Sequence, residues 1–397
     1  MTMGYLGVYI PVALGLVSFV SIWLISGKSI LAFNFLKVAV GDGVTEYAFA
    51  TIPLFTVMGL LVSRAGLGTD IYTVLNRLFR KLTGGVGVAT VGANAVFAAV
   101  TGSSIASASV FTRIAVPEMR KLNYNKRFAV GVVAGSSVLG MIIPPSAMLI
   151  IYSFVSEQSV GDMFLAGIVP GLILTVAYIA WIFIAGRLRP SYLGQGINEA
   201  ADEHLSLLEI LDKTVPTVAL IFLVLGGIYT GWLTPVEAGA AGALAALLIA
   251  LFRRSITAKG LWEPAIETGH ITASILFLIA MASLYSRMLG YAGLPNVLNE
   301  ALQTYDLGFW EVMIIYVLMM LFLGTILDTA SIILIVVPLF ITLVESMGMS
   351  LVWFGIITVI GAEIGLLTPP LGISCFVIKT ALNDPTISLK DVFLGAL

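Results

Sequence analysis

The sequence predicts an all-α membrane protein that crosses the bilayer several times. Of its 397 residues, 59% are apolar and only 11% are charged, and the mean hydropathy of +1.05 lies outside the range of ordinary soluble domains. Apolar blocks that approach or exceed the length needed to span a bilayer recur along the chain. They cover about residues 5–25, 45–62, 163–185, 214–229, 238–252 and 268–289. The first block is too long for a signal peptide and is expected to remain as a helix.

Composition also argues against several classes of function. The formal net charge of −2 argues against a nucleic-acid partner. Cys375, His204 and His270 have no second ligand at a spacing typical of metal sites. The sequence offers neither a catalytic base nor the metal ligands that an intramembrane protease needs. We therefore expect that the protein is not an enzyme.

Basic residues gather in alternate loops, which predicts the orientation of the spans. The basic loop residues are Arg77, Arg80, Lys81, Arg120, Lys121, Lys126, Arg127, Arg187, Arg189, Arg253, Arg254 and Lys259. Loops 157–162, 231–237, 294–307 and 345–350 contain no lysine or arginine. Because cytoplasmic loops carry an excess of lysine and arginine, the first set is expected to be cytoplasmic, as is the N-terminus, and the second set faces outward.

Two segments must enter the membrane and turn back on the same side. Residues 84–119 lie between two cytoplasmic clusters and are interrupted by VTGSSIASAS. Residues 308–345 lie between two outward loops and are interrupted by LGTILDTAS. The sequence therefore predicts two re-entrant hairpins of opposite orientation.

Opposed hairpins are typical of an inverted repeat, and the two halves of the chain match in the same order. GMIIPPS (140–146) matches GLLTPPL (365–371), and DMFLAG (162–167) matches DVFLGA (391–396). Ser107 lies ten residues before Pro117, as Asp328 lies ten residues before Pro338. We predict a first repeat at about residues 1–187, an amphipathic cytoplasmic connector at 188–213 and a second repeat at about 235–397.

A proline pair lies inside each of two apolar stretches, residues 128–155 and 351–382. Two adjacent prolines remove two amide donors and clash with the preceding turn, so each helix is expected to break. Broken backbone is tolerated at membrane depth only where it is buried in protein or lines a cavity. Prolines that merely kink a helix are the alternative, but a kink does not explain the pairing of each break with a tip rich in glycine and hydroxyl groups.

Helix breaks offer carbonyl oxygens at one helix end and amide donors at the next helix start. The carbonyl ends suit a small cation, and the amide ends suit a carboxylate. The candidate cation ligands are Thr101, Gly102, Ser103, Ser104, Gly140, Ile143 and Pro144 in the first half, and Gly324, Thr325, Asp328, Gly365, Leu366 and Thr368 in the second. The candidate substrate contacts are Ser104, Ser107, Pro145, Ser146, Asp328, Thr329 and Pro370.

Asp328 is a carboxylate inside an apolar stretch, where it is costly unless compensated. Its counterpart in the first repeat, Ser107, carries no charge. We expect Asp328 to compensate a bound cation or to act as a proton-sensitive partner of the substrate, and the alternative is a helix N-cap. Glu363 is expected to be a structural carboxylate behind the cation site and is not counted among the primary site residues.

The chain resembles the large membrane subunit of tripartite ATP-independent periplasmic (TRAP) transporters, within the wider ion-transporter superfamily. The resemblance covers essentially the whole chain. It rests on the tips TGSSIASAS and GTILDTASIILIVVPL, the breaks GMIIPPSAMLIIYS and GLLTPPLGISCFV, and the run DMFLAGIVPG.

The resemblance implies sodium-coupled secondary import of an organic acid anion, such as a sialic acid or a C4-dicarboxylate, across the bacterial inner membrane. It implies at least two Na⁺ sites, a small four-helix membrane subunit and a periplasmic substrate-binding protein as partners. It also implies an elevator movement of a transport domain, mainly 84–187 and 308–397, against a scaffold, mainly 1–65 and 214–290. The chain ends soon after DVFLGA, whereas the first-half counterpart continues through a full helix, so the last helix is expected to be incomplete.

A stand-alone cation-coupled carrier or exchanger of dicarboxylates or citrate is the main alternative. A pump subunit served by a separate ATPase chain is not excluded by the missing GxxxxGK[ST] loop, whereas a channel would not need opposed hairpins.

Overall fold

The computed structural model describes residues 9–193, 205–257, 260–370, 372–382 and 384–397, and in these residues the regular structure is helical, without strands. The predicted all-α class is therefore confirmed. Within the same ranges, five helices are long and apolar enough to cross a membrane, or six if one bent pair counts as a single span. The chain is accordingly a multi-pass membrane protein. Residues 5–8, where the first span was predicted to begin, lie outside the described residues.

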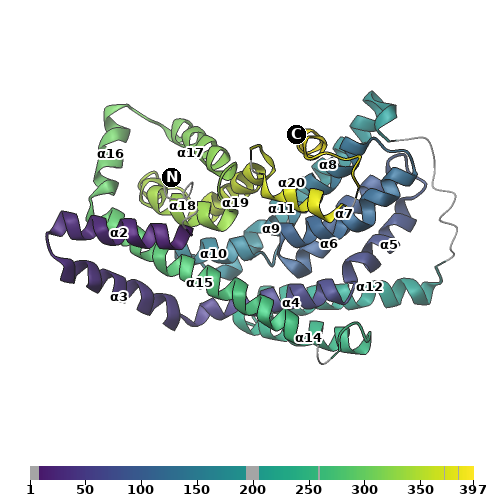
Figure 1. Cartoon of the computed structure of the whole chain (residues 1–397), viewed down its shortest axis with the longest axis horizontal. Helices are drawn as coiled ribbons and strands as arrows, with labels where there is room; N and C mark the ends of the chain where they lie inside the picture. Colours follow the sequence, from purple (N-terminus) through teal and green to yellow (C-terminus); the bar gives the residue numbers. More distant parts are fainter. Residues whose placement is uncertain (1–8, 194–204, 258–259, 371, 383) are drawn as a thin grey trace.

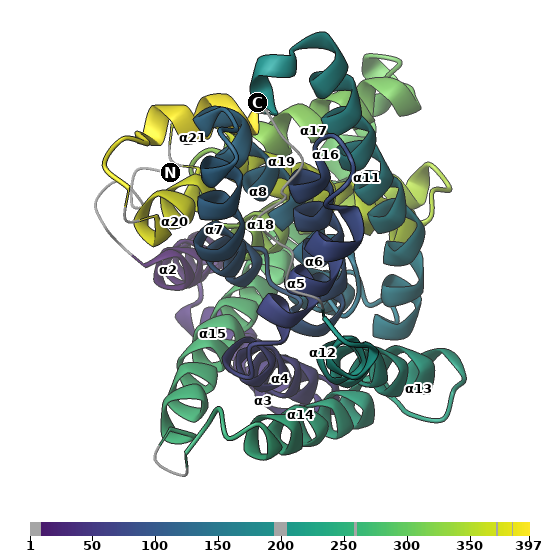
Figure 2. The same ribbon diagram turned by 90° about the vertical axis from the view of Figure 1, so that its right-hand side faces the viewer.

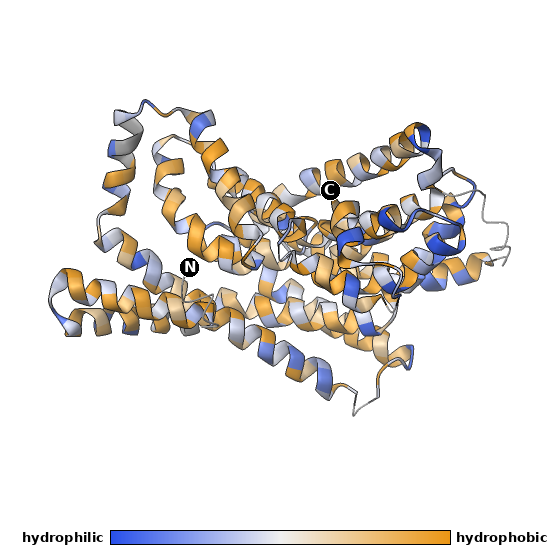
Figure 3. Cartoon of the chain, turned by 45° about the horizontal axis from the view of Figure 1, so that its top comes forward, coloured by the Kyte–Doolittle hydropathy of each residue, from blue (hydrophilic) through white to orange (hydrophobic). Residues whose placement is uncertain are grey.

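One group of helices lies along one side of the molecule, at the lower edge of Figure 1. In this group α15 packs against α2, α3 and α4, and α14 packs against α4. Its members are α2 (Ile10–Ser26), α3 (Ser29–Thr45), the short η1 (Tyr47–Ala50), α4 (Thr51–Arg64), α14 (Pro235–Phe252) and α15 (Trp262–Tyr291). Apolar helix surface dominates this side in Figure 3, as expected for helices in contact with lipid.

A second group holds the first predicted hairpin and the first predicted broken helix. It contains α5 (Leu67–Phe79), α6 (Gly85–Thr101), α7 (Ser104–Lys121), α8 (Lys126–Ser137), α9 (Leu139–Ile142), α10 (Ala147–Val155), α11 (Val160–Leu188) and the short η2 (Pro190–Tyr192). α6 packs against α5, α7 and α8. The helices before and after the break, residues 126–142 and 147–155, are bent by 44° relative to each other.

The third group holds the second predicted hairpin and the second predicted broken helix. It contains α16 (Leu294–Thr304), α17 (Phe309–Gly324), α18 (Thr329–Ser346), α19 (Leu351–Leu367), α20 (Ile373–Ala381) and α21 (Leu389–Ala396). α19 is central, because it packs against α17, α18, α11, α10 and α9. In Figure 1 it lies between α17–α18 on the left and α6–α7 on the right. α19 therefore joins the second hairpin to α9, α10 and α11 of the first half of the chain.

Two hydrogen bonds join α19 to its neighbours α17 and α10. Tyr316 Oη on α17 and Thr358 Oγ1 on α19 are hydrogen-bonded at 2.6 Å, and Tyr152 Oη on α10 donates to the carbonyl oxygen of Leu351 at 2.6 Å. All of these groups are buried. Hydrogen bonds between buried partners satisfy hydroxyl groups that would otherwise be costly in an apolar interior.

The connector differs from the prediction at its C-terminal end. Helix α12 (Leu207–Ile221) begins inside the predicted connector and runs past residue 213 without a break, continuing through the π-helical turn η4 (Phe222–Gly226) into α13 (Gly227–Tyr229). A capping box on Ser206 and Glu209 explains the early start, since each side chain accepts a hydrogen bond from the other residue's backbone N–H. Figure 2 shows α12 beside α5. The middle of the connector, residues 194–204, lies outside the described residues.

Candidate functional site

The first hairpin tip is a tight backbone turn between α6 and α7. Gly102 takes a left-handed conformation (φ 59°), and its N–H donates to the carbonyl oxygen of Ala98. Ser103 then caps α7 by accepting a hydrogen bond from the N–H of Ala106 at 3.3 Å. A glycine followed by a hydroxyl residue therefore ends one helix and starts the next within two residues.

The first tip touches the break between α9 and α10 directly. A Cβ atom on Gly102 would lie 2.4 Å from the carbonyl oxygen of Pro145, and one on Gly140 would lie 2.7 Å from the carbonyl carbon of Ser103. Ser146 caps α10 by accepting from the N–H of Leu149 and donates its hydroxyl proton to a carbonyl oxygen at the end of α9. The predicted tip and the predicted break therefore form one unit.

A cavity of about 690 Å³ lies against this unit. Four predicted site residues line it: Thr101, Gly102, Ser103 and Pro145. Ser104, Ser107 and Ser146 are fully buried and do not line the cavity.

Two other predicted cation ligands face α11 instead. A Cβ atom on Gly171 of α11 would lie 2.6 Å from the side chain of Ile143. A Cβ atom on Gly167 of α11 would lie 3.4 Å from the side chain of Pro144. Sequence spacing alone cannot separate residues on the two sides of a broken helix, because the backbone no longer follows the helical period there.

Three charged side chains line the same cavity: Arg64 of α4, Arg113 of α7 and Glu267 of α15. Arg64 Nη1 forms an ion pair with Glu263 Oε2 at 2.9 Å. Arg113 is exposed and has no ion-pair partner among the described residues. Sequence reasoning missed Arg113, although a charged residue on the second helix of a predicted re-entrant hairpin was a usable signal. It contributes a positive charge that suits an anion.

The second tip connects α17 to α18 through Thr325–Asp328. Asp328 is the N-cap of α18: its Oδ1 accepts from the N–H of Ser331 at 3.1 Å, and its Oδ2 accepts from Ser331 Oγ at 2.5 Å. Thr325 Oγ1 donates to the carbonyl oxygen of Phe322 at 2.8 Å. The capping alternative for Asp328 is therefore realised in the structure, and a charge role stays a prediction.

The second break follows α19 at Thr368 and ends at Gly372, which caps α20. Thr368 Oγ1 donates to the carbonyl oxygen of Ile364 at 2.9 Å. Gly324 and Gly365 bring α17 and α19 into contact beside this break, and Leu366 is buried with them. Pro370 is exposed. The predicted ligands of the second half are therefore near one another, but they do not line the 690 Å³ cavity.

Glu363 on α19 is fully buried, with an exposed fraction of 0%. Its Oε1 accepts a hydrogen bond from Thr329 Oγ1, the first residue of α18, at 2.8 Å. Buried carboxyl groups are rare inside membrane segments and commonly mark functional positions. The sequence placed Glu363 behind the cation site, but its contact with the second hairpin could not be read from residues 34 positions apart.

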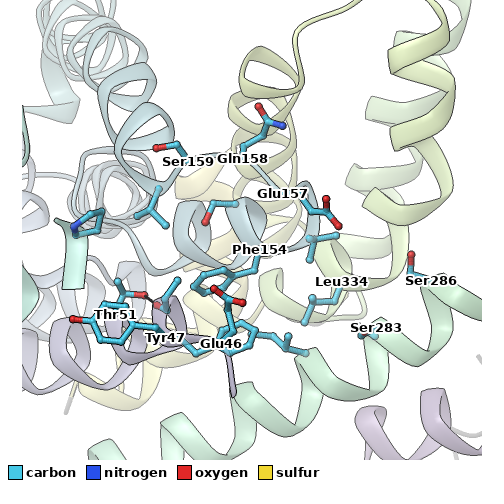
Figure 4. A pocket seen from close by; sticks show the side chains of 18 of the residues that line it. Glu46, Tyr47, Thr51, Phe154, Glu157, Gln158, Ser159, Ser283, Ser286 and Leu334 are labelled. Carbon is cyan, nitrogen blue, oxygen red and sulfur yellow. Dashed lines mark hydrogen bonds between the residues drawn. The ribbon is translucent and has the colours of Figure 1, made fainter. Parts of the chain in front are cut away.

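A second cavity, of about 910 Å³, lies between η1, α14 and α15 on one side and α10, α11 and α18 on the other. Figure 4 shows Glu46 and Tyr47 of the η1 segment near Phe154 of α10, with Glu157 on the opposite wall. None of the predicted site residues lines it. The cavity lies beside loop 157–162, which the loop charges predict to face outward.

Together these features define a class of protein: a polytopic helical membrane protein with a cavity that is lined in part by the ends of interrupted helices, the arrangement found in secondary transporters. The model of the family described as "Tripartite ATP-independent periplasmic transporter, DctM component" matches residues 1–393. The chain belongs to this family, the large permease component of TRAP transporters, and the resemblance inferred from the sequence is confirmed.

Individual relatives agree with this assignment. The chain is 31% identical over 377 residues to the C4-dicarboxylate TRAP transporter large permease protein DctM of Pseudomonas aeruginosa, covering 94% of this chain and 86% of that protein. It is 28% identical to the sialic acid TRAP transporter large permease protein SiaM of Vibrio cholerae, covering 99% and 92%. These relatives are transporter permease subunits, not enzymes.

The fold is also similar to a solved structure, the YdaH transporter of Alcanivorax borkumensis. The TM-score is 0.67 with 14% sequence identity, over 92% of this chain and 85% of that one. At this identity the likeness concerns the fold alone.

Proposed function

We propose that this protein is the large membrane subunit of a sodium-coupled secondary importer of an organic acid anion, such as a C4-dicarboxylate or a sialic acid. The observation that carries the proposal is the 690 Å³ cavity, which is lined by the end of α6, the start of α10 and a cationic side chain, Arg113. Helix ends supply the carbonyl oxygens that a cation needs, and an arginine together with amide donors suits a carboxylate.

Sodium coupling is supported by the chemistry of the two tips. Carbonyl and hydroxyl oxygens are the ligands that hard cations prefer. The residues that would hold Na⁺ in the first half are Thr101, Gly102 and Ser103, and those in the second half are Gly324, Thr325 and Thr368. Ion binding at both tips would stabilise the interrupted backbone and so favour the conformation that holds the substrate.

An inverted repeat and an elevator movement are part of this proposal. The transport domain would comprise mainly 84–187 and 308–397 and would move against a scaffold of mainly 1–65 and 214–290. The packing of α2, α3, α4, α14 and α15 into a separate group supports such a division. The basic loops support a cytoplasmic N-terminus and location in the bacterial inner membrane.

A small four-helix membrane subunit and a periplasmic binding protein are the proposed partners. The deciding experiment is uptake of labelled organic acids into proteoliposomes that contain this chain and the small subunit, with a panel of binding proteins added outside. We expect uptake to require a binding protein and an inward sodium gradient, and to be cooperative in sodium.

Potassium and choline gradients are the controls in this experiment. Equal uptake with potassium or choline would refute sodium coupling. Sodium-driven uptake of a dicarboxylate or citrate without a binding protein would instead identify a stand-alone carrier.

A further inference from the structure

Glu363 stands at a junction between the two hairpins. Its carboxyl accepts a hydrogen bond from Thr329, the first residue of α18 in the second hairpin. The hydroxyl of Ser104, the first residue of α7 in the first hairpin, is a second polar neighbour of the same carboxyl group. A single side chain of α19 therefore faces the first residue of the second helix of both hairpins.

The surroundings of this carboxyl group are closed to solvent. Glu363 and Ser104 are 0% exposed, and Thr329 is 3% exposed. Within the described residues, Ser104 Oγ and Glu363 Oε2 each lack a hydrogen-bond partner, so their contact falls short of hydrogen-bond geometry. Buried polar atoms are nearly always paired in native proteins, and Ser104 Oγ and Glu363 Oε2 are two buried atoms that each lack such a partner in the described part of the chain.

The starts of α7 and α18 favour a carboxyl group at the position of Glu363. The first residues of a helix carry unpaired N–H groups and a positive partial charge, which favour a nearby carboxyl group. Glu363 therefore lies where the starts of α7 and α18 both attract it. It also lies two residues before Gly365, the glycine that contacts the end of α17.

We infer that Glu363 is a positioning residue that couples the two hairpin tips, so that a change at one tip is transmitted to the other. This inference rests on the proposed function, in which each tip holds a cation. Binding at the second tip orders Thr329, which holds Glu363 in place, and Glu363 in turn holds Ser104 and the start of α7. The two cation sites are thereby made interdependent through one buried side chain.

Amide hydrogen exchange of the full chain in lipid nanodiscs tests the inference. The variants are Thr329→Val, which removes the hydroxyl donor and keeps the side-chain shape, and Glu363→Leu, which removes both contacts. We expect each variant to raise exchange at residues 101–107 of the first tip by at least tenfold, although Thr329 belongs to the other half of the chain. Glu363→Gln keeps an acceptor for Thr329 and a donor for Ser104, so its exchange at both tips should stay within threefold of the wild type.

Thr358→Val is the matched control. Thr358 is buried on the same helix, but its hydroxyl bonds with Tyr316 and touches neither tip. Thr358→Val should leave amide exchange at both tips within threefold of the wild type. If α19 were loosened in general, exchange at the tips would rise in both Thr358→Val and Glu363→Leu. If Glu363→Leu does not fold, Thr329→Val alone decides.

Unchanged exchange at the first tip in Thr329→Val would overturn the inference. The exchange measurement is repeated with and without sodium, so that failure of this inference can be distinguished from failure of the proposed function. A wild-type protein whose tips do not respond to sodium would contradict sodium coupling, but the effect of Thr329→Val on the first tip would still decide the role of Glu363.

Discussion

Gly324 at the end of α17 and Gly365 in α19 bring two helix backbones into direct contact. A Cβ atom on Gly324 would lie 2.5 Å from the Cα of Gly365, and a Cβ atom on Gly365 would lie 2.6 Å from the Cα of Gly324. Neither neighbour is a flexible side chain, so the backbones themselves would have to separate. This contact joins the end of one hairpin helix to the helix that precedes the second break.

Replacement of either glycine by alanine should therefore destabilise the protein. Overpacking of a close contact typically costs about 1–3 kcal/mol. We expect Gly324→Ala and Gly365→Ala to lower the midpoint of thermal unfolding in detergent, measured by loss of the monodisperse peak in size-exclusion chromatography. Gly269→Ala is the control, because a Cβ atom on this glycine of α15 meets nothing within 4 Å. An unchanged midpoint in both glycine variants would mean that the contact is not maintained in the detergent-solubilised protein.

A third glycine, Gly59 of α4, lies against the first tip. A Cβ atom at this position would lie 2.8 Å from the carbonyl oxygen of Thr101. This carbonyl is a candidate cation ligand, and α4 belongs to the proposed scaffold. Gly59→Ala should therefore lower the uptake rate by about tenfold, equivalent to about 1.4 kcal/mol, while membrane abundance is retained. Gly269→Ala again serves as the control, and normal uptake by Gly59→Ala would show that the tip does not depend on this close approach.

Local features of the chain could be predicted from the sequence, because their causes are local. The helix ends at Thr101, Gly324 and Leu367 lie beside a glycine or a proline pair, whose backbone effects do not depend on the rest of the fold. The predicted amphipathic connector and the apolar block from about residue 214 are joined in one helix, α12, whose start is set by the capping box at Ser206 and Glu209.

Contacts between distant segments could not be predicted in the same way. Thr329 and Glu363 meet only because α18 and α19 pack together, and Gly59 meets Thr101 only because α4 packs against α6. The separation of predicted ligands into those that line the cavity and those that face α11, such as Ile143, also depends on the direction of the broken backbone.

Asp391 at the start of α21 should make stability depend on pH. Its carboxyl accepts hydrogen bonds from Lys126 Nζ at 2.7 Å and Arg127 Nε at 2.9 Å, which hold its pKa well below the usual range. A lowered pKa in the folded state means that the stabilisation is complete above the unfolded pKa of about 4 and is lost as the pH falls below it. We expect Asp391→Asn to lower stability at pH 7 by about 1–2 kcal/mol, and this difference from the wild type should shrink below about pH 4.

Asp162 is the matched control for this prediction. It also follows a capping serine by three residues at the start of a helix, since its N–H donates to Ser159 Oγ at 3.3 Å. It is exposed and has no ion pair among the described residues. Asp162→Asn should change thermal stability little at any pH. A loss as large as that of Asp391→Asn would attribute the effect to the helix start and not to the two basic side chains.

Asp328 allows its capping and charge roles to be separated, because asparagine caps a helix nearly as well as aspartate. The structure gives the carboxylate a capping contact with Ser331 and leaves the side chain half-buried beside the second tip. If its charge compensates a bound cation, Asp328→Asn should lower sodium-driven uptake by more than tenfold, a penalty above about 1.4 kcal/mol, without loss of stability. Asp328→Ala should lose the cap as well and be less stable by about 1 kcal/mol. Both variants are compared with the wild type by uptake into proteoliposomes and by thermal unfolding. Near-normal uptake by Asp328→Asn, together with a stability defect in Asp328→Ala, would reject the charge role and leave the cap, because asparagine retains the hydrogen bond to Ser331 and removes only the charge.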